Sequence, residues 1–210
     1  MRKITLLLAL LMLSSAAVAQ ELPTVDLPPP VMEGGKPLMQ ALRERVSQRE
    51  FAPDPLAPQV LSNLLWAAWG ISRPDSGKRT APSAMNRQET DVYVALPAGL
   101  YRYEAKGHRL IPVVAGDLRA QTGSQPFVAT AALNLIYVSR VSGGSAEDRL
   151  TWGAAHAGFI SENVYLFCAS EGLATVVRGM VNREALAKAM KLGPDERIIL
   201  AQSVGYPKKK

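Results

Sequence analysis

The longest regular pattern in this chain is EDRLTWGAAHAGFISENVYLFCASEGL, residues 147–173, whose apolar spacing predicts a single long helix. A β-branched stretch at 174–181 follows directly and predicts a strand, then come a helix at 182–193 and a last strand at 196–207. Helices that alternate with strands in this way bury their apolar faces against a sheet. The pattern therefore favours the α+β class, folded as an α/β sandwich.

The first half of the chain adds two helices and more of the sheet. Apolar spacing predicts helices at 38–50 and 56–71. Alternation predicts a strand at 91–97 that continues as a hairpin through the turn EAKGH, and an apolar run at 129–141 predicts a buried strand. We therefore expect one domain, residues 38–210, with a central mixed, mainly antiparallel sheet flanked by helices.

The ends of two helices carry local signals. Pro58 suits the first turn of the second helix and Gly70 its end. Asn182 suits the N-cap and Gly193 the C-cap of the helix at 182–193. The buried face of the second helix is expected to consist of Leu61, Leu64, Leu65, Ala68 and Trp69.

The N-terminus has the pattern of a secretion signal. Arg2 and Lys3 precede the apolar run ITLLLALLML, and Ala17-Val18-Ala19 predicts cleavage after Ala19. The apolar run, about ten residues, is too short to span a membrane. We expect a periplasmic protein, exported by the general secretory route and without a membrane span after cleavage of residues 1–19; an uncleaved anchor is the alternative. Residues 20–37, rich in proline and glycine, predict an extended arm rather than a fold element.

Charge and cysteine content argue against several classes of protein. Cleavage removes two bases and no acid, so the formal net charge falls from +6 to +4, with no basic cluster except the terminal KKK; nucleic-acid binding is disfavoured. The single cysteine, Cys168, cannot form an intramolecular disulfide and suits a buried small residue better than a nucleophile. With only His108 and His156 beside it, no zinc or haem site is expected.

The motif RVSQR brings two guanidiniums and a hydroxyl close together. On a helix Arg45 and Arg49 share a face, with Ser47 between them. Arginine offers forked donors that fit phosphate oxygens, so the motif suits a phosphate clamp. The alternative is a solvated helix face, with the arginines paired to Glu44 or Glu50.

The stretch RTAPSAMNRQE, called here the 79–89 loop, separates a helix pattern from a strand pattern. Pro82, Ser83 and Ala84 are small enough to bring backbone close to a flat ligand, and the amides of Asn86 and Gln88 can meet ring carbonyls and ring N–H groups. A plain connecting loop is the alternative.

Two later stretches could also approach a ligand. In SEGLAT, Gly172 after Glu171 lets a ligand approach the main chain, although a helix C-cap is the alternative. GYPKKK contributes cations, including Lys208, although it also fits a solvated tail.

Taken in order over nearly all of residues 38–208, these pieces resemble the nitroreductase-like flavoprotein family. The resemblance is greatest to its SagB-type dehydrogenase branch, some of whose members oxidise azolines to azoles. It is carried by RVSQREF, LLWAAWGI, RTAPSAMNRQ, VYVALPAGLYRYEAKGHRL, QPFVATAALNLIYV, GFISENVYLFCASEGLATV and VGYPK.

The resemblance implies a homodimer with FMN at the subunit interface, and we expect the 20–37 arm to wrap the second subunit. It assigns the phosphate and ribityl chain to Arg45, Ser47 and Arg49, with Lys208 completing the phosphate site. Members of the family usually carry a further Lys or Arg later in the C-terminal tail, and Lys209 or Lys210 could take its place here. The isoalloxazine ring would be contacted by Pro82, Ser83, Ala84, Asn86, Gln125, Glu171 and Gly172. Met85 stands where the family often has glycine.

The implied chemistry is hydride transfer at flavin N5 to or from a small organic substrate, which needs little from side chains. We name no catalytic side chain, and we expect Tyr101 and Tyr103 to be strand packing and Glu162 to be a helix-surface residue. Nicotinamide cofactors are scarce outside the cytoplasm, so the electron donor is left open between NAD(P)H, a quinol and a redox protein. The alternatives are a non-catalytic, degenerate flavin-binding or electron-transfer protein, or a binder of another ligand such as a tetrapyrrole.

Overall fold

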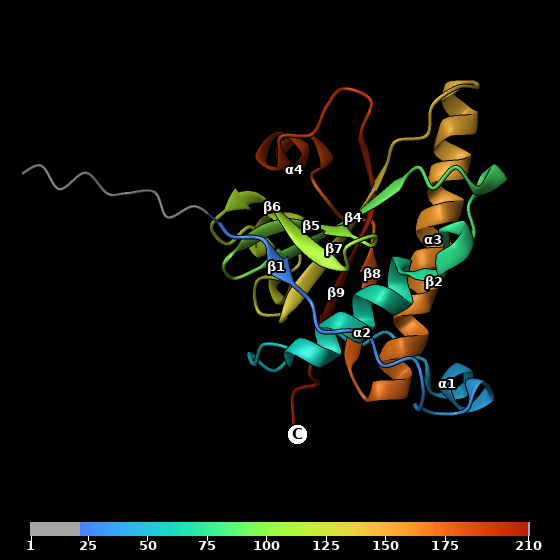
Figure 1. Cartoon of the computed structure of the whole chain (residues 1–210). Helices are drawn as coiled ribbons and strands as arrows, with labels where there is room; N and C mark the ends of the chain where they lie inside the picture. The colour runs from blue at the N-terminus through green and yellow to red at the C-terminus, as the bar shows by residue number, and fades with distance from the viewer. Residues whose placement is uncertain (1–21, 210) are drawn as a thin grey trace, which may run out of the picture.

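A seven-stranded sheet forms the centre of the computed structural model, which describes residues 22–209 (Figure 1). Its order is β1-β6-β5-β4-β7-β9-β8, and each of these pairings is antiparallel, which confirms the mainly antiparallel sheet. The strands are β1 (Val25–Asp26), β4 (Thr90–Leu96), β5 (Gly99–Glu104), β6 (Arg109–Ala115), β7 (Leu133–Ser139), β8 (Ala174–Arg178) and β9 (Arg197–Gly205).

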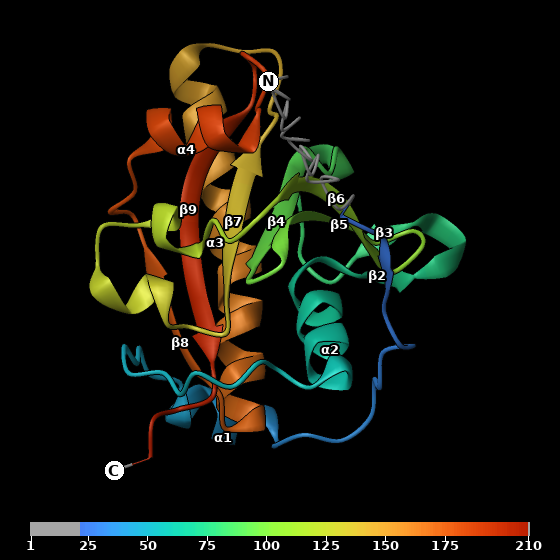
Figure 2. The same ribbon diagram turned by 90° about the vertical axis from the view of Figure 1, so that its left-hand side faces the viewer.

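Four α-helices within residues 22–209 pack around this sheet (Figures 1 and 2). They are α1 (Leu38–Glu44), α2 (Pro58–Trp69), α3 (Ala146–Glu171) and α4 (Arg183–Met190). In the buried strand β7, Leu135 and Tyr137 belong to the core cluster shared with α2 and α3, whereas Ile136 and Val138 belong to the cluster shared with α4. Because side chains alternate along a strand, this single strand supplies both cores and makes the molecule a three-layer sandwich.

The long helix α3 and helix α2 confirm the patterns that predicted them. Pro58 opens α2, and Gly70 ends it by donating its N–H to the Trp66 carbonyl. Ser145 and Asp148 form a capping box at the start of α3, and Asn182 caps α4. Among the described residues no helix is both long enough and apolar enough to cross a membrane.

Two predicted helix ends are wrong. The helix expected at 38–50 ends at Glu44, and Arg45 has extended dihedral angles, because the next residues bond to distant strands. Helix α4 ends at Met190 with Lys191 in the left-handed conformation, so Gly193 is not its C-cap. Lys191 closes the helix by donating its N–H to the carbonyls of Ala187 and Lys188.

The arm preceding α1 is also part of the fold, contrary to the expectation from its composition. Val25 and Asp26 form β1 at the edge of the sheet, paired with β6. Farther along, Val31 donates its N–H to the Asn63 side chain on α2, and the Lys36 N–H bonds the Ser170 hydroxyl near the end of α3. The described part of the arm, residues 22–37, therefore lies along its own domain. The predicted signal peptide, residues 1–19, lies outside the described residues.

A chain of side-chain hydrogen bonds holds the arm to α2 and the sheet. The Ser62 hydroxyl donates to the Pro28 carbonyl, so it accepts from His108 Nε2–H at 2.7 Å. This leaves His108 Nδ1 to accept from the Tyr103 hydroxyl at 2.8 Å. Ser62 is fully buried, so this serine–histidine pair is structural and cannot serve as a nucleophile.

This histidine predicts a loss of stability on mild acidification. Burial lowers the pKa of His108 from its ordinary 6.5, so below that value the unfolded chain takes up a proton before the folded chain does. The free energy of unfolding should therefore fall as the pH drops from 7.5 to 5.5, measured by urea denaturation. His108→Gln keeps a donor and an acceptor but does not titrate, so its stability should fall less over this interval. An equal fall in both proteins would contradict the assignment.

Candidate functional site

The segment 45–49 lies between the start of β8 and the end of the chain, rather than on a helix. Gln48 donates its N–H to the Thr175 carbonyl at 2.9 Å, and Lys208 donates its N–H to the Glu50 carbonyl at 3.2 Å. An isolated antiparallel bridge joins Phe51 to Pro207. Backbone pairing across the whole length of the sequence thus brings RVSQR and the C-terminal lysines together, near the lower end of α3 in Figure 1.

A cavity of about 550 Å³ opens where these two segments meet, and Arg49 and Lys208 line it together with Gln48, Glu50 and Pro207. Arg45 and Arg49 are exposed, and no carboxylate of residues 22–209 forms an ion pair with Arg45, Arg49 or Lys208. The expected alternative, pairing of the arginines with Glu44 or Glu50, is therefore wrong. The cationic side chains of Arg45, Arg49 and Lys208 therefore remain available to bind a phosphate group.

Ser47 occupies a different position from the two arginines. Its hydroxyl lies 2.8 Å from the Tyr165 hydroxyl, which also accepts the Val177 N–H at 2.9 Å. The Arg45 guanidinium lies 5.4 Å from the centre of the Tyr165 ring, within range of a cation–π contact. Tyr165 on α3 therefore organises the motif. No sequence pattern indicates this role, because Tyr165 belongs to an ordinary helical pattern far along the chain from the motif.

A second cavity, of about 170 Å³, adjoins the first and shares Gln48 and Pro207 with it. It extends to Gly172, which closes α3 in the left-handed conformation at φ 70° and has no neighbouring atom where a Cβ would stand. The Gly172 N–H already donates to the Cys168 carbonyl. Gly172 is thus the predicted C-cap, and what it offers a ligand is space beside the main chain rather than a free N–H. Glu171 is exposed beside it.

Lys36 forms one wall of this second cavity and was not identified from the sequence. Its ammonium donates to Glu44 Oε2 at 2.8 Å and to the Ala169 carbonyl at 2.9 Å. Hydrogen bonds from Lys36 and Gln40 lower the pKa of Glu44 to about 2. Through Lys36, which is paired with Glu44 and bonded to the Ala169 carbonyl, the arm is thus held against the C-terminal end of α3.

The 79–89 loop lies elsewhere on the same helix, beside the upper half of α3 in Figure 1. Ala84 donates its N–H to His156 Nε2 at 2.8 Å. His156 precedes Gly172 by 16 residues, which is about 24 Å along a helix. Within one chain, the loop residues Pro82, Ser83, Ala84 and Asn86 are therefore separate from the cavities at Arg49 and Gly172.

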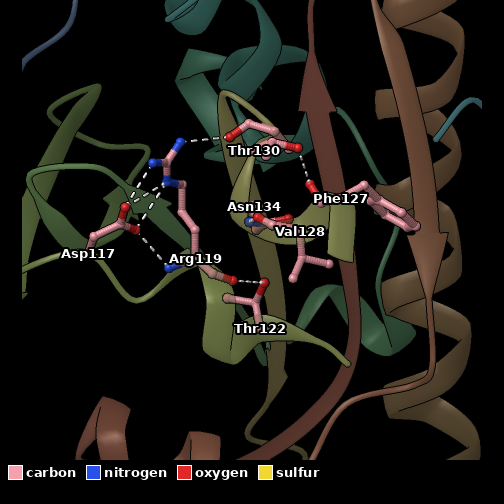
Figure 3. Close-up of polar contacts among 8 residues, drawn as sticks. Asp117, Arg119, Thr122, Phe127, Val128, Thr130 and Asn134 are labelled. Atoms are coloured by element: carbon pink, nitrogen blue, oxygen red, sulfur yellow. Dashed lines mark hydrogen bonds and ion pairs between the residues drawn. The ribbon is translucent and has the colours of Figure 1, made fainter. Parts of the chain in front are cut away.

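Gln125 begins the short 3-10 turn η4 (Pro126–Ala129) and is half-buried. Figure 3 shows the surroundings of this segment, with Arg119 paired to Asp117 at 2.8 Å. Arg119 also donates to the Ala131 carbonyl, and Asn134 donates to the Val128 carbonyl. The neighbouring Phe127 ring packs 5.8 Å from the Phe51 ring. The turn is therefore fixed beside the segment 45–51, but Gln125 does not line either of the two cavities.

The remaining side chains considered in the sequence analysis lie in the core or on a helix surface. Tyr101 and Tyr103 are buried in the sheet and Glu162 is exposed on α3, as expected. Cys168 is fully buried, and burial raises the pKa of its thiol strongly, so it is not a reactive nucleophile. Residues 22–209 contain no cluster of three histidine, cysteine or acidic side chains that could hold a metal ion.

Comparison with known proteins places these features in context. The model of the Nitroreductase family matches residues 42–206. A crystal structure from Ralstonia eutropha JMP134, of a protein provisionally named a nitroreductase, is 47% identical with a TM-score of 0.85, over 89% of this chain and 90% of that one. A Methanocaldococcus jannaschii protein, also provisionally named a nitroreductase, is 28% identical over 168 residues, 74% of this chain and 84% of its own. The NADPH:FMN oxidoreductase of Vibrio harveyi, solved with NAD+, shares the fold at 16% identity and a TM-score of 0.61, over 82% of this chain and 69% of that one.

Proposed function

The chain belongs to the nitroreductase family of flavin-dependent oxidoreductases, and from that premise we propose that it binds FMN and transfers hydride to or from a small organic substrate. The observation that carries the choice of FMN is the joined pair of cavities, cationic at Arg49 and Lys208 and open at Gly172. A flavin mononucleotide has a phosphate at one end and a flat ring at the other, so it suits a site with these two ends.

The cationic side chains at one end of the site fit the phosphate group of FMN. Arg45, Arg49 and Lys208 bring three cationic side chains that form no ion pair with an acidic residue among residues 22–209, enough positive charge to balance a phosphate dianion. Ser47, held by Tyr165, is placed to orient the segment between the arginines. The predicted phosphate-binding roles of Arg45, Arg49 and Lys208 are therefore kept in the proposal, whereas Ser47, predicted to hold the phosphate and ribityl chain, is proposed to act through the segment that it orients.

The ring end would lie against Gly172. A side chain there would project into the open space that a flat ring needs. When bound, the flavin supplies hydride transfer at N5. The residues of this chain bind the phosphate, leave room for the ring and hold the end of α3 in place through Lys36.

We further propose that the active form is a homodimer. The 79–89 loop, expected to contact the ring, is about 24 Å along α3 from Gly172 in its own chain. A second copy related by a two-fold axis, with the two α3 helices running in opposite directions, would bring the loop of each chain to the cavity of the other. Exposed apolar side chains on both regions support this arrangement: Leu38, Met39 and Leu42 on α1, Met85 on the loop, and Leu150, Trp152 and Phe159 on α3.

Two finer parts of the proposal come from the sequence. The pattern of residues 1–19 supports export to the periplasm, where a quinol or a redox protein would be a more accessible electron donor than NAD(P)H. The ordered pieces from RVSQREF to VGYPK support membership of the SagB-type dehydrogenase branch, which favours operation as a dehydrogenase on a small organic substrate.

The visible spectrum of the purified protein, residues 20–210, supplemented with FMN and desalted, tests the proposal. We expect flavin absorption bands that remain with the protein and FMN that is released on denaturation. Bleaching under anaerobic conditions by NADPH, a quinol analogue or dithionite would then identify the class of donor. Bound FMN that dithionite alone bleaches would favour the non-catalytic alternative, and a colourless protein that takes up no FMN would refute the proposal.

A further inference from the structure

His156 is a buried histidine that no part of the proposed flavin chemistry uses. It lies in α3 with 1% of its surface exposed, one turn after Trp152, whose ring lies 6.2 Å from the imidazole at 31°. Its Nε2 accepts the Ala84 N–H at 2.8 Å, which ties the 79–89 loop to the long helix.

This hydrogen bond defines the protonation of the ring. Nε2 accepts a hydrogen bond from a backbone N–H, so it carries no proton, and the neutral ring has its own proton on Nδ1. Nδ1 is buried and has no hydrogen-bond partner among the described residues. Burial lowers the pKa of His156, which favours the same neutral form, while the charge of Glu89 opposes this effect. A protonated ring would lose the acceptor that Ala84 uses.

The loop needs such support because its backbone is strained. Met85, Asn86 and Gln88 have φ values of 52°, 55° and 55°, in the left-handed region that residues with a Cβ disfavour. Two hydrogen bonds from Gln88 hold this shape: its N–H donates to the Ser83 hydroxyl within the loop, and its side-chain amide donates to the Gly77 carbonyl just before the loop. These bonds hold the shape of the loop, but they do not set its position on α3.

We propose that His156 is a positioning residue, whose neutral imidazole holds Ala84 so that the segment 82–86 meets the flavin ring of the second subunit. The inference rests on the proposed function, since it presupposes a flavin shared across the dimer. Met85 is 83% exposed beside Ala84, so a shift of the loop would also move this side chain relative to the ring. The phosphate-binding residues Arg45, Arg49 and Lys208 do not depend on the hydrogen bond between His156 and Ala84, so positioning should affect turnover more than cofactor retention.

Three substitutions of His156 distinguish the effect of losing the hydrogen-bond acceptor for the Ala84 N–H from the effect of losing side-chain packing. In His156→Gln the side-chain oxygen lies about as far along the side chain as Nε2, so the Ala84 N–H keeps an acceptor. In His156→Asn the oxygen occupies the position of Nδ1 and cannot reach the amide. His156→Leu fills the space without any acceptor. Each is compared with the wild type as an FMN-loaded protein for thermal stability, FMN affinity, flavin circular dichroism, and kcat and KM with the donor identified above.

We expect His156→Gln to retain activity within about threefold, and His156→Asn and His156→Leu to lose up to about 100-fold in turnover, because small misplacements of a catalytic site have effects of that order. His156→Asn and His156→Leu should keep FMN but change the visible circular dichroism of the flavin. Equal activity in all four proteins would overturn the inference, as would equal loss in all three variants in proportion to lost thermal stability. If the wild type itself binds no FMN, the proposed function fails first, and the inference fails with it.

Discussion

Replacing Arg45 and Arg49 together by alanine should abolish FMN binding under conditions in which the wild type is saturated. Arg49 lines the cationic cavity, and Arg45 lies over the Tyr165 ring four residues before it. Both side chains are exposed and make no ion pairs within residues 22–209. A hydrogen bond to a charged group contributes about 1.5–3 kcal/mol, so losing two should cost about 3–6 kcal/mol and raise Kd about 10²- to 10⁴-fold. Flavin fluorescence titration measures the change directly.

The matched control for this variant is Lys106→Ala with Lys188→Ala. These lysines are exposed and lie on the β5–β6 turn and on α4, so the control removes the same charge at a distance from the cavity. It should bind FMN with nearly wild-type affinity. Full FMN retention by the double arginine variant would show that the phosphate lies elsewhere, whereas equal weakening in both variants would point to a general effect of net charge.

Placing glutamate at Met39 and Phe159 should convert the proposed dimer into monomers. Met39 on α1 and Phe159 on α3 are 76% and 47% exposed, so the fold of one chain does not depend on burying them. In an isologous dimer each substitution occurs twice, and a buried unpaired carboxylate costs about 3–5 kcal/mol. Sedimentation equilibrium should show the mass of one chain, and FMN affinity should fall in parallel, because the ring would lose its contacts from the second 79–89 loop.

Met180→Glu is the control for the interface variant. Met180 is also an exposed apolar residue, at 61%, but it lies in the connection between β8 and α4, away from α1, α3 and the 79–89 loop. It should leave the mass and the FMN affinity unchanged. A Met39→Glu/Phe159→Glu variant that remains dimeric would refute the interface, and a monomer that binds FMN with full affinity would refute the shared site.

Local sequence patterns predicted the regular elements well where each element is stabilised by its own periodicity. In α2, Pro58 and the spacing of Leu64, Leu65 and Ala68 were enough, because the helix and its buried face follow from the same period. Helix α3 and the paired strands β4 and β5 could be predicted from the sequence equally well. The patterns failed at α1, because the continuation of its amphipathic spacing beyond Glu44 competes with a backbone hydrogen bond from Gln48 to Thr175.

By itself, then, the sequence determined the α+β sandwich, its long central helix and the residue types suited to a flavin, since these follow from local periodicity and from an ordered set of motifs. Only the tertiary structure decided which motifs meet. It brought Arg49 and Lys208 to one cavity, hydrogen-bonded Ser47 to Tyr165, folded the arm onto its own domain and fixed the 79–89 loop on His156, far along α3 from Gly172. Each of these contacts joins residues far apart in the chain, and the hydrogen bond or packing that stabilises it depends on a distant partner that no local pattern specifies.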